Sequence, residues 1–367
     1  MAKYEPSHLK NKNTEIVFRQ FRSGESLFVN EIARVTKISV PTVMKIVDSL
    51  IAKELVQVQE VQEVSPKVGR KPNMLELNRS KYFSIGVIYE GDYLQLGIVD
   101  LAGEVTHASQ VRVGKNFGDS IIRNIDRLLD NSGREVENLI GIGIGLPCIF
   151  NPNTREIIAP LIGIEEPQYF GDTIDKIAAL YNSQVIVDND LNIQAYGEYV
   201  NLAANPKHDL VFISLGTGLG AGVIIDGNIR HGNSNICGEI GYMMYSSDEE
   251  KEHLYLEDII NFKALETRFG VTESLGSKEQ IRKARAYVAR HLAILVNNLI
   301  FTYDISDVVL DGLVLEILGN ELLVEIQERL NAICFSPTEI RRKDSPWPGI
   351  LGGGFLVENQ WLNNFLK

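Results

Sequence analysis

The feature that most constrains the fold of this chain is a run of three strands, a helix and a fourth strand between residues 83 and 144. The apolar pattern predicts consecutive strands over 83–89, 93–99 and 104–111, separated by tight turns. A helix is expected at about 119–131 and an apolar strand at 139–144. This order of elements predicts an α/β domain, in which helices pack on a sheet.

A second half that is also rich in strands follows the first. Strands are expected over residues 184–187, 210–215 and 308–310, with a helix ending near Tyr199 and a long helix over about 277–303. Two successive halves of this kind predict an actin-like (ribonuclease H-like) domain with two lobes, of the type found in sugar kinases. We expect this domain to span residues 81–367.

Residues 1–80 follow a different pattern, with three short helices and then a hairpin. Residues 36–39 form the turn before the third helix, Ser39 is placed to cap that helix, and Pro41 lies in its first turn. This helix has apolar residues at the spacing of a buried face: Val43, Ile46, Val47 and Leu50. With strands expected near 55–59 and 74–77, residues 1–80 are predicted to form a winged helix-turn-helix domain with its linker.

The charge of the chain is divided unevenly between these two parts. The whole chain of 367 residues has a net charge of -12, which by itself argues against binding to nucleic acid. Residues 1–80, however, contain 13 Lys and Arg against 9 Asp and Glu, a net charge of +4, and the remainder has a net charge of -16. A small basic part joined to a large acidic part is compatible with DNA binding by the first part only.

The sequence also predicts where the protein works. No apolar run approaches the ~20 residues that cross a bilayer, and the first residues lack the apolar core of a secretory signal. The three cysteines stand far apart, which fits a reducing compartment and gives no sign of a zinc site. We expect a cytoplasmic protein with no membrane partner.

The start of the third helix is the candidate DNA-reading element, because the corresponding residues of a helix-turn-helix lie in the major groove. These residues are Ser39, Val40, Pro41, Thr42 and Lys45. Thr42 and Lys45 can hydrogen-bond to bases or phosphates, and Val40 can contact a thymine methyl group. Candidate phosphate contacts are Arg19, Arg22, Lys37 and Lys53. The alternative is a three-helix bundle with a solvated basic face.

A second candidate DNA contact follows the hairpin, in the stretch Gly69-Arg70-Lys71-Pro72. Glycine permits close approach of the backbone to DNA, and proline keeps the segment extended. Arg70 is then free to enter a narrow minor groove, where the negative potential is enhanced, with Lys71 beside it. The alternative is an ordinary basic linker.

Two motifs in the larger part can bind a ligand. In Asp188-Asn189-Asp190, Asp190 can take a proton from a sugar hydroxyl and Asn189 can hydrogen-bond to neighbouring hydroxyls, although such a turn also caps helices. Residues 216–222 are glycine-rich and follow a strand, so their backbone N–H groups can surround a phosphate, or simply form a turn between strands. Glu239 and Glu257 are further carboxylates, either for binding hydroxyls or on the surface.

In combination these motifs resemble the ROK family (repressors, open reading frames and kinases), and specifically its winged helix-turn-helix repressors of sugar operons, such as the xylose and N-acetylglucosamine repressors. The resemblance covers nearly the whole chain, and the matching segments occur in the order of the family. They are residues 32–33, 39–43, 50–51, 69–72, 141–147, 188–190, 216–222 and 238–241.

The resemblance implies roles for individual residues. Asn189, Asp190, Glu239 and Glu257 match sugar-contacting positions, and Asp190 is the equivalent of the kinase general base. Tyr242 stands where the family has a histidine that touches sugar and binds zinc, and the Cys-rich loop is absent. The equivalent of the phosphate loop, here vestigial, comprises Gly216, Thr217, Gly218 and Gly220.

The departures from the family pattern argue against catalysis. Ile88 stands where the kinases carry an aspartate, Cys148 replaces a glycine, and a downstream Gly-Gly is Asp311-Gly312. Phosphoryl transfer depends on a bound metal and on positioning, and an aliphatic side chain supplies neither. We therefore expect no catalytic residue, no cofactor and no metal.

The favoured interpretation is a sugar-responsive regulator that represses a carbohydrate-utilisation operon. Its expected partners are operator DNA, a small sugar effector and a second copy of the chain, as a homodimer or a tetramer. One alternative is an ATP-dependent sugar kinase with a DNA-binding head, and another is a repressor that responds to no ligand because its pocket is vestigial.

Overall fold

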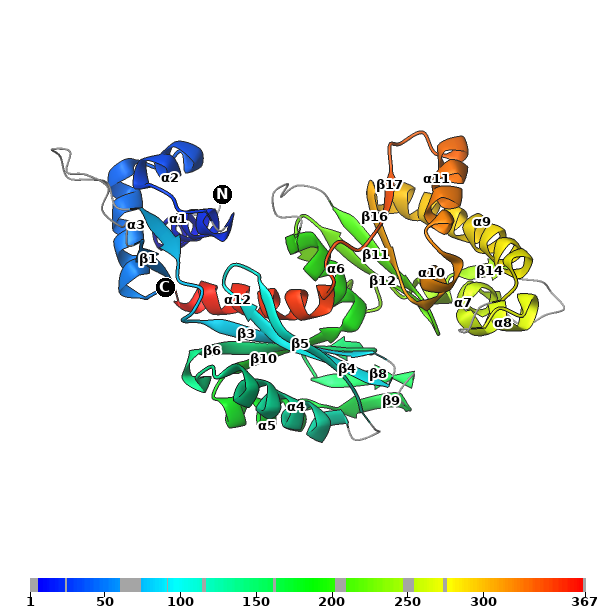
Figure 1. The fold of residues 1–367 in the computed structure, drawn as a ribbon, viewed down its shortest axis with the longest axis horizontal. Coiled ribbons are helices and arrows are strands. Elements are labelled where there is room, and N and C mark those ends of the chain that lie inside the picture. Colours follow the sequence, from blue (N-terminus) through cyan, green and yellow to red (C-terminus); the bar gives the residue numbers. More distant parts are fainter. Residues whose placement is uncertain are drawn as a thin grey trace.

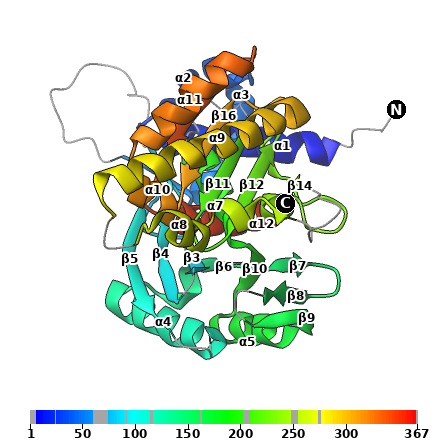
Figure 2. The ribbon, with the colours of Figure 1, turned by 90° about the vertical axis from the view of Figure 1, so that its right-hand side faces the viewer.

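In a computed structural model, the protein consists of a small head and two larger lobes (Figures 1 and 2). The structure describes residues 6–23, 25–59, 74–90, 92–113, 117–160, 163–201, 209–246, 254–272 and 276–365. Within these ranges, no helix combines the length and the apolar character needed to cross a membrane. The α/β class, the two lobes and the winged helix-turn-helix head are confirmed.

The head consists of three helices and a small wing. Its elements are α1 (Pro6–Gln20), a 3-10 turn (Phe21–Ser23), α2 (Val29–Thr36), α3 (Val40–Ala52), β1 (Val56–Val58) and β2 (Leu75–Leu77). The predicted apolar face of α3 is buried throughout. Strands β1 and β2 pair antiparallel, and Leu27 bridges to Leu75 beside them. Ser39 takes the N-cap position of α3, but its hydroxyl bonds to that of Thr42 at 2.8 Å instead of a backbone N–H.

The first lobe is built on a five-stranded sheet in the order β10-β6-β3-β4-β5. Its strands are β3 (Phe83–Glu90), β4 (Tyr93–Asp100), β5 (Val105–Arg112), β6 (Leu139–Leu146) and β10 (Gln184–Asn189). Strands β3, β4 and β5 form an antiparallel meander, and β6 and β10 run parallel to β3. Helices α4 (Phe117–Ser132) and α5 (Gly171–Tyr181) cover its outer face, and β7 (Ile149–Asn151), β8 (Glu156–Ala159) and β9 (Ile164–Tyr169) form a small side sheet (Figure 2).

The second lobe repeats this arrangement with the sheet order β13-β12-β11-β16-β17. Its strands are β11 (Leu210–Leu215), β12 (Leu219–Ile225), β13 (Asn228–Ile229), β16 (Asp307–Asp311) and β17 (Glu339–Arg342). The other elements are a 3-10 turn (Ile240–Tyr242), the hairpin β14 (Met244–Ser246) and β15 (Leu254–Tyr255), and helices α7 (Glu257–Ile260), α8 (Phe262–Phe269), α9 (Lys278–Tyr303), α10 (Leu313–Leu318) and α11 (Glu321–Ile333).

The glycine-rich turn after β11 is shorter than the sequence predicts. The turn comprises only residues 216–218, because β12 begins at Leu219 and pairs antiparallel with β11. Gly220 and Gly222 therefore lie in a strand. A Cβ on Gly222 would lie 2.3 Å from the carbonyl oxygen of Leu191, so this glycine permits close packing of the strand on the next helix, α6 (Asp190–Asn201).

Helices α6 and α12 (Pro348–Phe365) pack together between the two lobes, and the far end of α12 reaches the head (Figure 1). The first half of α12 is rich in glycine, and this part of the helix packs directly against the backbone of neighbouring elements. A Cβ on Gly352 would lie 2.0 Å from the carbonyl oxygen of Ile193, and one on Gly86 2.0 Å from that of Ile350. The second half supplies Val357 and Leu362 to the apolar core of the head.

Candidate ligand cleft and DNA-binding face

A cavity of about 500 Å³ lies between the lobes and brings the predicted ligand residues together. Its lining comes from the ends of β3, β6 and β10, the start of α6, the turn after β11 and the residues before and within α7. All five predicted sugar-binding residues line it: Asn189, Asp190, Glu239, Tyr242 and Glu257. The four predicted phosphate-loop residues line it too, including Gly220 in its strand. Residues from distant parts of the sequence thus share one cavity.

The residues of the Asp188-Asn189-Asp190 motif have different roles, some structural and some in the lining of the cleft. The side-chain oxygen of Asn189 accepts bonds from the backbone N–H groups of Leu191 at 2.9 Å and Asn192 at 3.2 Å, so Asn189 caps α6. Its amide also donates to the carbonyl of Cys148 at 3.1 Å. The helix-capping alternative therefore describes Asn189 well, and leaves Asp190 as the carboxylate of the motif that lines the cleft.

Asp188 performs a third role, because it joins the two lobes. Its carboxylate bonds to the His231 ring at 2.6 Å, and His231 follows β13 in the second lobe. The same carboxylate accepts bonds from the backbone N–H of Asn189 and the side-chain amide of Asn192. The bond to Asp188 raises the pKa of His231 above its usual value, which favours the charged ring.

The carboxylates in the cleft are close enough to repel one another. Burial, and then the charge of Glu90, raise the pKa of Asp190 from 3.8 to about 7. Burial and the charge of Glu257 raise the pKa of Glu239. Burial followed by Asp311 raises that of Glu90, at the end of β3. Glu90 lies outside the motifs of the sequence, because the family pattern of this hairpin has its acid two residues earlier, at the position of Ile88.

On the side of the cleft where a phosphate would bind, two backbone donors are already bonded within the protein. The backbone N–H of Gly216 bonds to the carbonyl of Gly218 at 2.9 Å, and that of Leu219 bonds to the Glu257 carboxylate at 3.2 Å. Ile88 is 1% exposed and packs against Gly349 of α12. A Cβ on Gly349 would lie 2.3 Å from the Ile88 side chain. This side chain is part of the core between β3 and α12.

Tyr242 and the cysteines complete the lining. Tyr242 is 57% exposed at the mouth of the cleft, where its ring meets the edge of Tyr255 at 5.7 Å between centroids. Cys148 is buried, and burial with the nearby carboxylates raises the pKa of its thiol. Cys148 and Cys237 both line the cavity, and no group of three His, Cys, Asp or Glu suited to a metal occurs in the part of the chain that the structure describes.

The predicted reading end of α3 is open to solvent. Ser39, Val40, Pro41 and Lys45 are exposed, and Thr42, whose hydroxyl bonds to that of Ser39, is half-buried. Met44, which the sequence analysis left out, is 51% exposed on the same side. Arg70 and Lys71 fall outside the described residues, so their predicted contact to the minor groove stays a prediction.

Two of the four predicted phosphate contacts in the head face the body of the protein instead. Arg22 forms an ion pair with Glu358 of α12, and its guanidinium lies 4.5 Å from the centre of the Phe355 ring. Lys53 donates to the carbonyl of Phe365 and lies over the ring of that residue. The prediction that Arg22 and Lys53 contact DNA phosphates is therefore wrong. Arg22 is paired with a buried acid, and Lys53 is bonded to the end of α12. Arg19 pairs with Glu15 on the surface and Lys37 is exposed.

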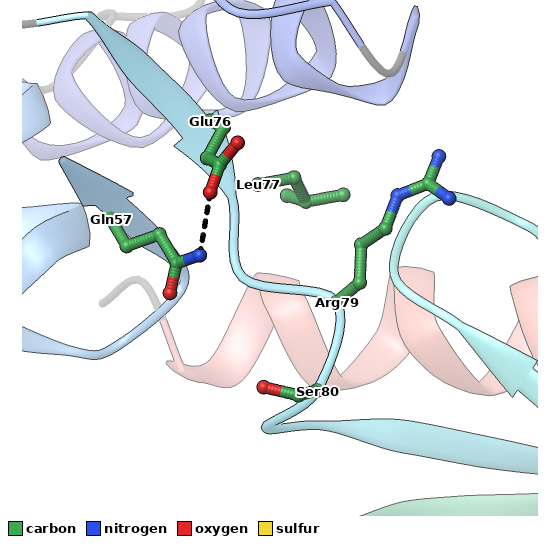
Figure 3. Close-up of a pocket in the computed structure, with 5 residues that line it drawn as sticks. All are labelled: Gln57, Glu76, Leu77, Arg79 and Ser80. Carbon is green, nitrogen blue, oxygen red and sulfur yellow. Dashed lines mark hydrogen bonds between the residues drawn. The ribbon is translucent and has the colours of Figure 1, made fainter. Parts of the chain in front are cut away.

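A smaller hollow of about 230 Å³ lies where the wing joins the first lobe (Figure 3). Gln57 and Glu76 face each other across the wing strands with a hydrogen bond of 2.7 Å. The Arg79 guanidinium points away from this pair and bonds to Glu104 at 2.9 Å. These groups satisfy one another, so the hollow is a junction between head and body.

Comparison with known proteins places this architecture in a family. A sequence model of the ROK family matches residues 84–344. The xylose repressor of Bacillus spizizenii is 27% identical over 239 residues, which cover 64% of this chain and 61% of that protein. The match thus spans less than two thirds of the length of this relative.

Solved structures agree in fold. The crystal structure of a ROK family transcriptional regulator, a homologue of the Escherichia coli MLC protein, matches with a TM-score of 0.76 and 16% identity over 98% of both chains. A ROK family glucokinase from Streptomyces griseus, solved with glucose and AMPPNP, matches with a TM-score of 0.59 and 21% identity over 76% of this chain and 99% of its own. With a family match over most of its length and both lobes reproduced, the chain belongs to the ROK family.

Proposed function

We propose that this protein is a sugar-responsive DNA-binding regulator, which represses a carbohydrate-utilisation operon in the cytoplasm. Residues 1–80 are the DNA-binding domain with its linker, and residues 81–367 are the sugar-binding domain. Its partners are operator DNA, a sugar effector and a second copy of the chain, as a homodimer or a tetramer. The xylose repressor among its relatives supports this proposal.

The observation that carries the proposal is the position of α12. Its first half packs on α6, whose first residue is Asp190 in the cleft, and its second half packs on the head through Glu358 and Arg22. A ligand that changes how the lobes sit on α6 has a direct mechanical route to α3. Such a ligand shifts the equilibrium between two head orientations by its difference in affinity for them.

The residues proposed to read DNA are Ser39, Val40, Pro41, Thr42, Lys45, Arg70 and Lys71. The residues proposed to bind the sugar are Asn189, Asp190, Glu239, Tyr242 and Glu257. Asn189 contributes by fixing the start of α6, since its side-chain oxygen already accepts two backbone bonds. The glycine turn at 216–218 is proposed to be a vestige of a phosphate loop.

The test of this proposal compares DNA capture with and without sugar. Purified protein is incubated with fragments of genomic DNA in the presence of single sugars, and the retained fragments are sequenced. We expect a defined set of fragments to be retained and to be released by one sugar. Asp190→Ala should retain the same fragments and no longer release them, whereas an unchanged release concentration would place the effector elsewhere.

A sugar kinase is the second candidate function, because a carboxylate with a pKa of about 7 suits a general base. Against it stand the buried Ile88 and the occupied N–H groups of Gly216 and Leu219. An assay for ATP-dependent phosphorylation of common hexoses and pentoses decides between the two. Turnover that Asp190→Ala abolishes would establish the kinase. If calorimetry detects binding of no sugar, the regulator is independent of a ligand.

A further inference from the structure

The charged side chains that line the cleft are all of one sign. Glu90, Asp190, Glu239 and Glu257 line it, and no Lys, Arg or His does so among the described residues. Two cations beside the lining residues are already paired: Lys343 bonds to Asp311 at 2.7 Å, and His231 bonds to Asp188, which precedes Asn189. The cleft thus presents four carboxylates to whatever enters it.

These carboxylates lack cationic partners of their own. None of the four has an ion pair with another residue in the described ranges. Glu257 accepts the N–H of Leu219, and Glu90 accepts the amide of Gln95 at 3.3 Å. Glu90 repels Asp190 and Glu257 repels Glu239, and the nearby Lys343, itself bonded to Asp311, only partly offsets the charge at Glu90.

A second, independent observation points to a ligand at this place. Asn192 lines the cleft and is 5% exposed, and its side-chain oxygen is buried without a hydrogen-bond partner within the described structure. Its amide already donates to Asp188 at 3.0 Å, which fixes the orientation of the group. A buried acceptor left open in this way is satisfied when a ligand brings a donor.

We propose that the cleft takes an amino sugar with a free ammonium group and rejects sugar phosphates and other anionic sugars. This inference rests on the proposed function and names the chemical class of its effector. The ammonium is placed between Glu90 and Asp190, and the ring hydroxyls donate to Glu239, Glu257 and Asn192. A phosphate entering on the side of Gly216 meets Glu90 and finds the N–H groups of Gly216 and Leu219 already bonded.

The experiment is calorimetry on the full chain at pH 7 with matched sugars. Glucosamine, glucose and glucose 6-phosphate form one set, galactosamine, galactose and galactose 6-phosphate a second, and N-acetylglucosamine keeps the nitrogen without its charge. We expect the better amino sugar to bind at least ten-fold more tightly than both its neutral parent and, for the glucose set, the acetylated form. We expect no measurable binding of either phosphate.

Glu90→Gln tests the position of the charge. This variant should lose most of the preference for the amino sugar while its affinity for the neutral parent changes less than two-fold. Asp92→Asn, on the same hairpin but exposed and paired with Arg112, is the matched control and should keep the preference. If Glu90→Gln melts below the assay temperature, Glu90→Ala replaces it, with the same expected loss of preference.

The outcomes separate this inference from the proposed function. A neutral sugar that binds as tightly as its amino counterpart overturns the inference. So does a sugar phosphate that binds and releases operator DNA, although the proposed function then stands. If none of these sugars or any other tested sugar binds or releases DNA, both fail.

Discussion

The contact between Arg22 and Glu358 offers a direct test of how the head is held on the body. Glu358 is 1% exposed and the Arg22 side chain 18% exposed, so the pair is largely removed from water. Burial raises the pKa of Glu358 despite the opposing effect of Arg22. Replacing Glu358 with Gln keeps the shape of the side chain but leaves the guanidinium without its counter-charge.

The free-energy cost of Glu358→Gln depends on the contacts that Arg22 keeps in the variant. Removing one member of a buried ion pair costs about 3–5 kcal/mol. Arg22 retains its position over the Phe355 ring, a contact worth about 1–2 kcal/mol, and the Gln amide oxygen still accepts one hydrogen bond. We therefore expect Glu358→Gln to weaken docking of the head by about 1–3 kcal/mol.

Hydrogen exchange followed by mass spectrometry measures this loss region by region. The amides of α1, α2 and α3 should exchange faster in Glu358→Gln, and those of α9 in the second lobe should not. Glu279→Gln removes the acid of an exposed pair with Arg282 and should leave exchange in the head unchanged, because water screens such a pair. Unchanged exchange in the head, together with sugar-dependent DNA release like that of the parent, would refute the role of this pair.

Three further predictions concern the reading helix and the cleft. Lys45→Ala should weaken operator binding by roughly 1–3 kcal/mol per half-site in a titration at fixed salt, and Lys176→Ala on the first lobe should not; equal effects would contradict base reading. Because the pKa of Asp190 is raised from 3.8 to about 7, the folded state loses stability as pH rises from about 4 to about 7, where only the unfolded chain has lost this proton. Asp190→Asn should thus raise the free energy of unfolding in urea by up to about 4 kcal/mol at pH 8 and change it little at pH 4, and a difference independent of pH would speak against the shift. The pKa of His231 is also raised, so the Asp188–His231 pair stabilises the protein below about pH 6.5 and loses this effect as pH rises through the folded pKa. His231→Asn should remove that component from the pH profile of thermal unfolding, and an identical profile would mean that the pair contributes nothing.

Local patterns were sufficient to predict much of the fold. The spacing of Val43, Ile46, Val47 and Leu50 fixes which face of α3 is buried, because a helix repeats every 3.6 residues. The first two strands of the meander have long apolar runs bounded by turns, and all three strands form within one or two residues of their expected ranges. The five residues that the family resemblance predicts to bind sugar all line one cavity, although their role stays a prediction.

The remaining features depend on contacts that no local pattern encodes. Residues 349–354 include four glycines, which disfavour a helix by about 1 kcal/mol each relative to alanine, and yet they form α12. The helix forms there because Gly86, Gly143 and Gly197 allow its backbone to lie directly on theirs. In the same way, the basic character of Arg22 gave no indication of its acid 336 positions away.

The glycine contacts of α12 also bear on the proposed regulation. At Gly352 the backbone of α12 contacts that of α6, and at Gly86 the backbone of β3 contacts that of α12, with no side chains between them. These surfaces therefore have little room to slide past one another. A change at the start of α6 is then transmitted by rotation of α6 and α12 as a unit. Glu358 lies ten residues after the start of α12 at Pro348, about 15 Å along the helix, so α12 converts a small rotation near the cleft into a larger displacement at Glu358. On the proposed function, the buried charge pair is therefore the place where occupancy of the cleft reaches the head.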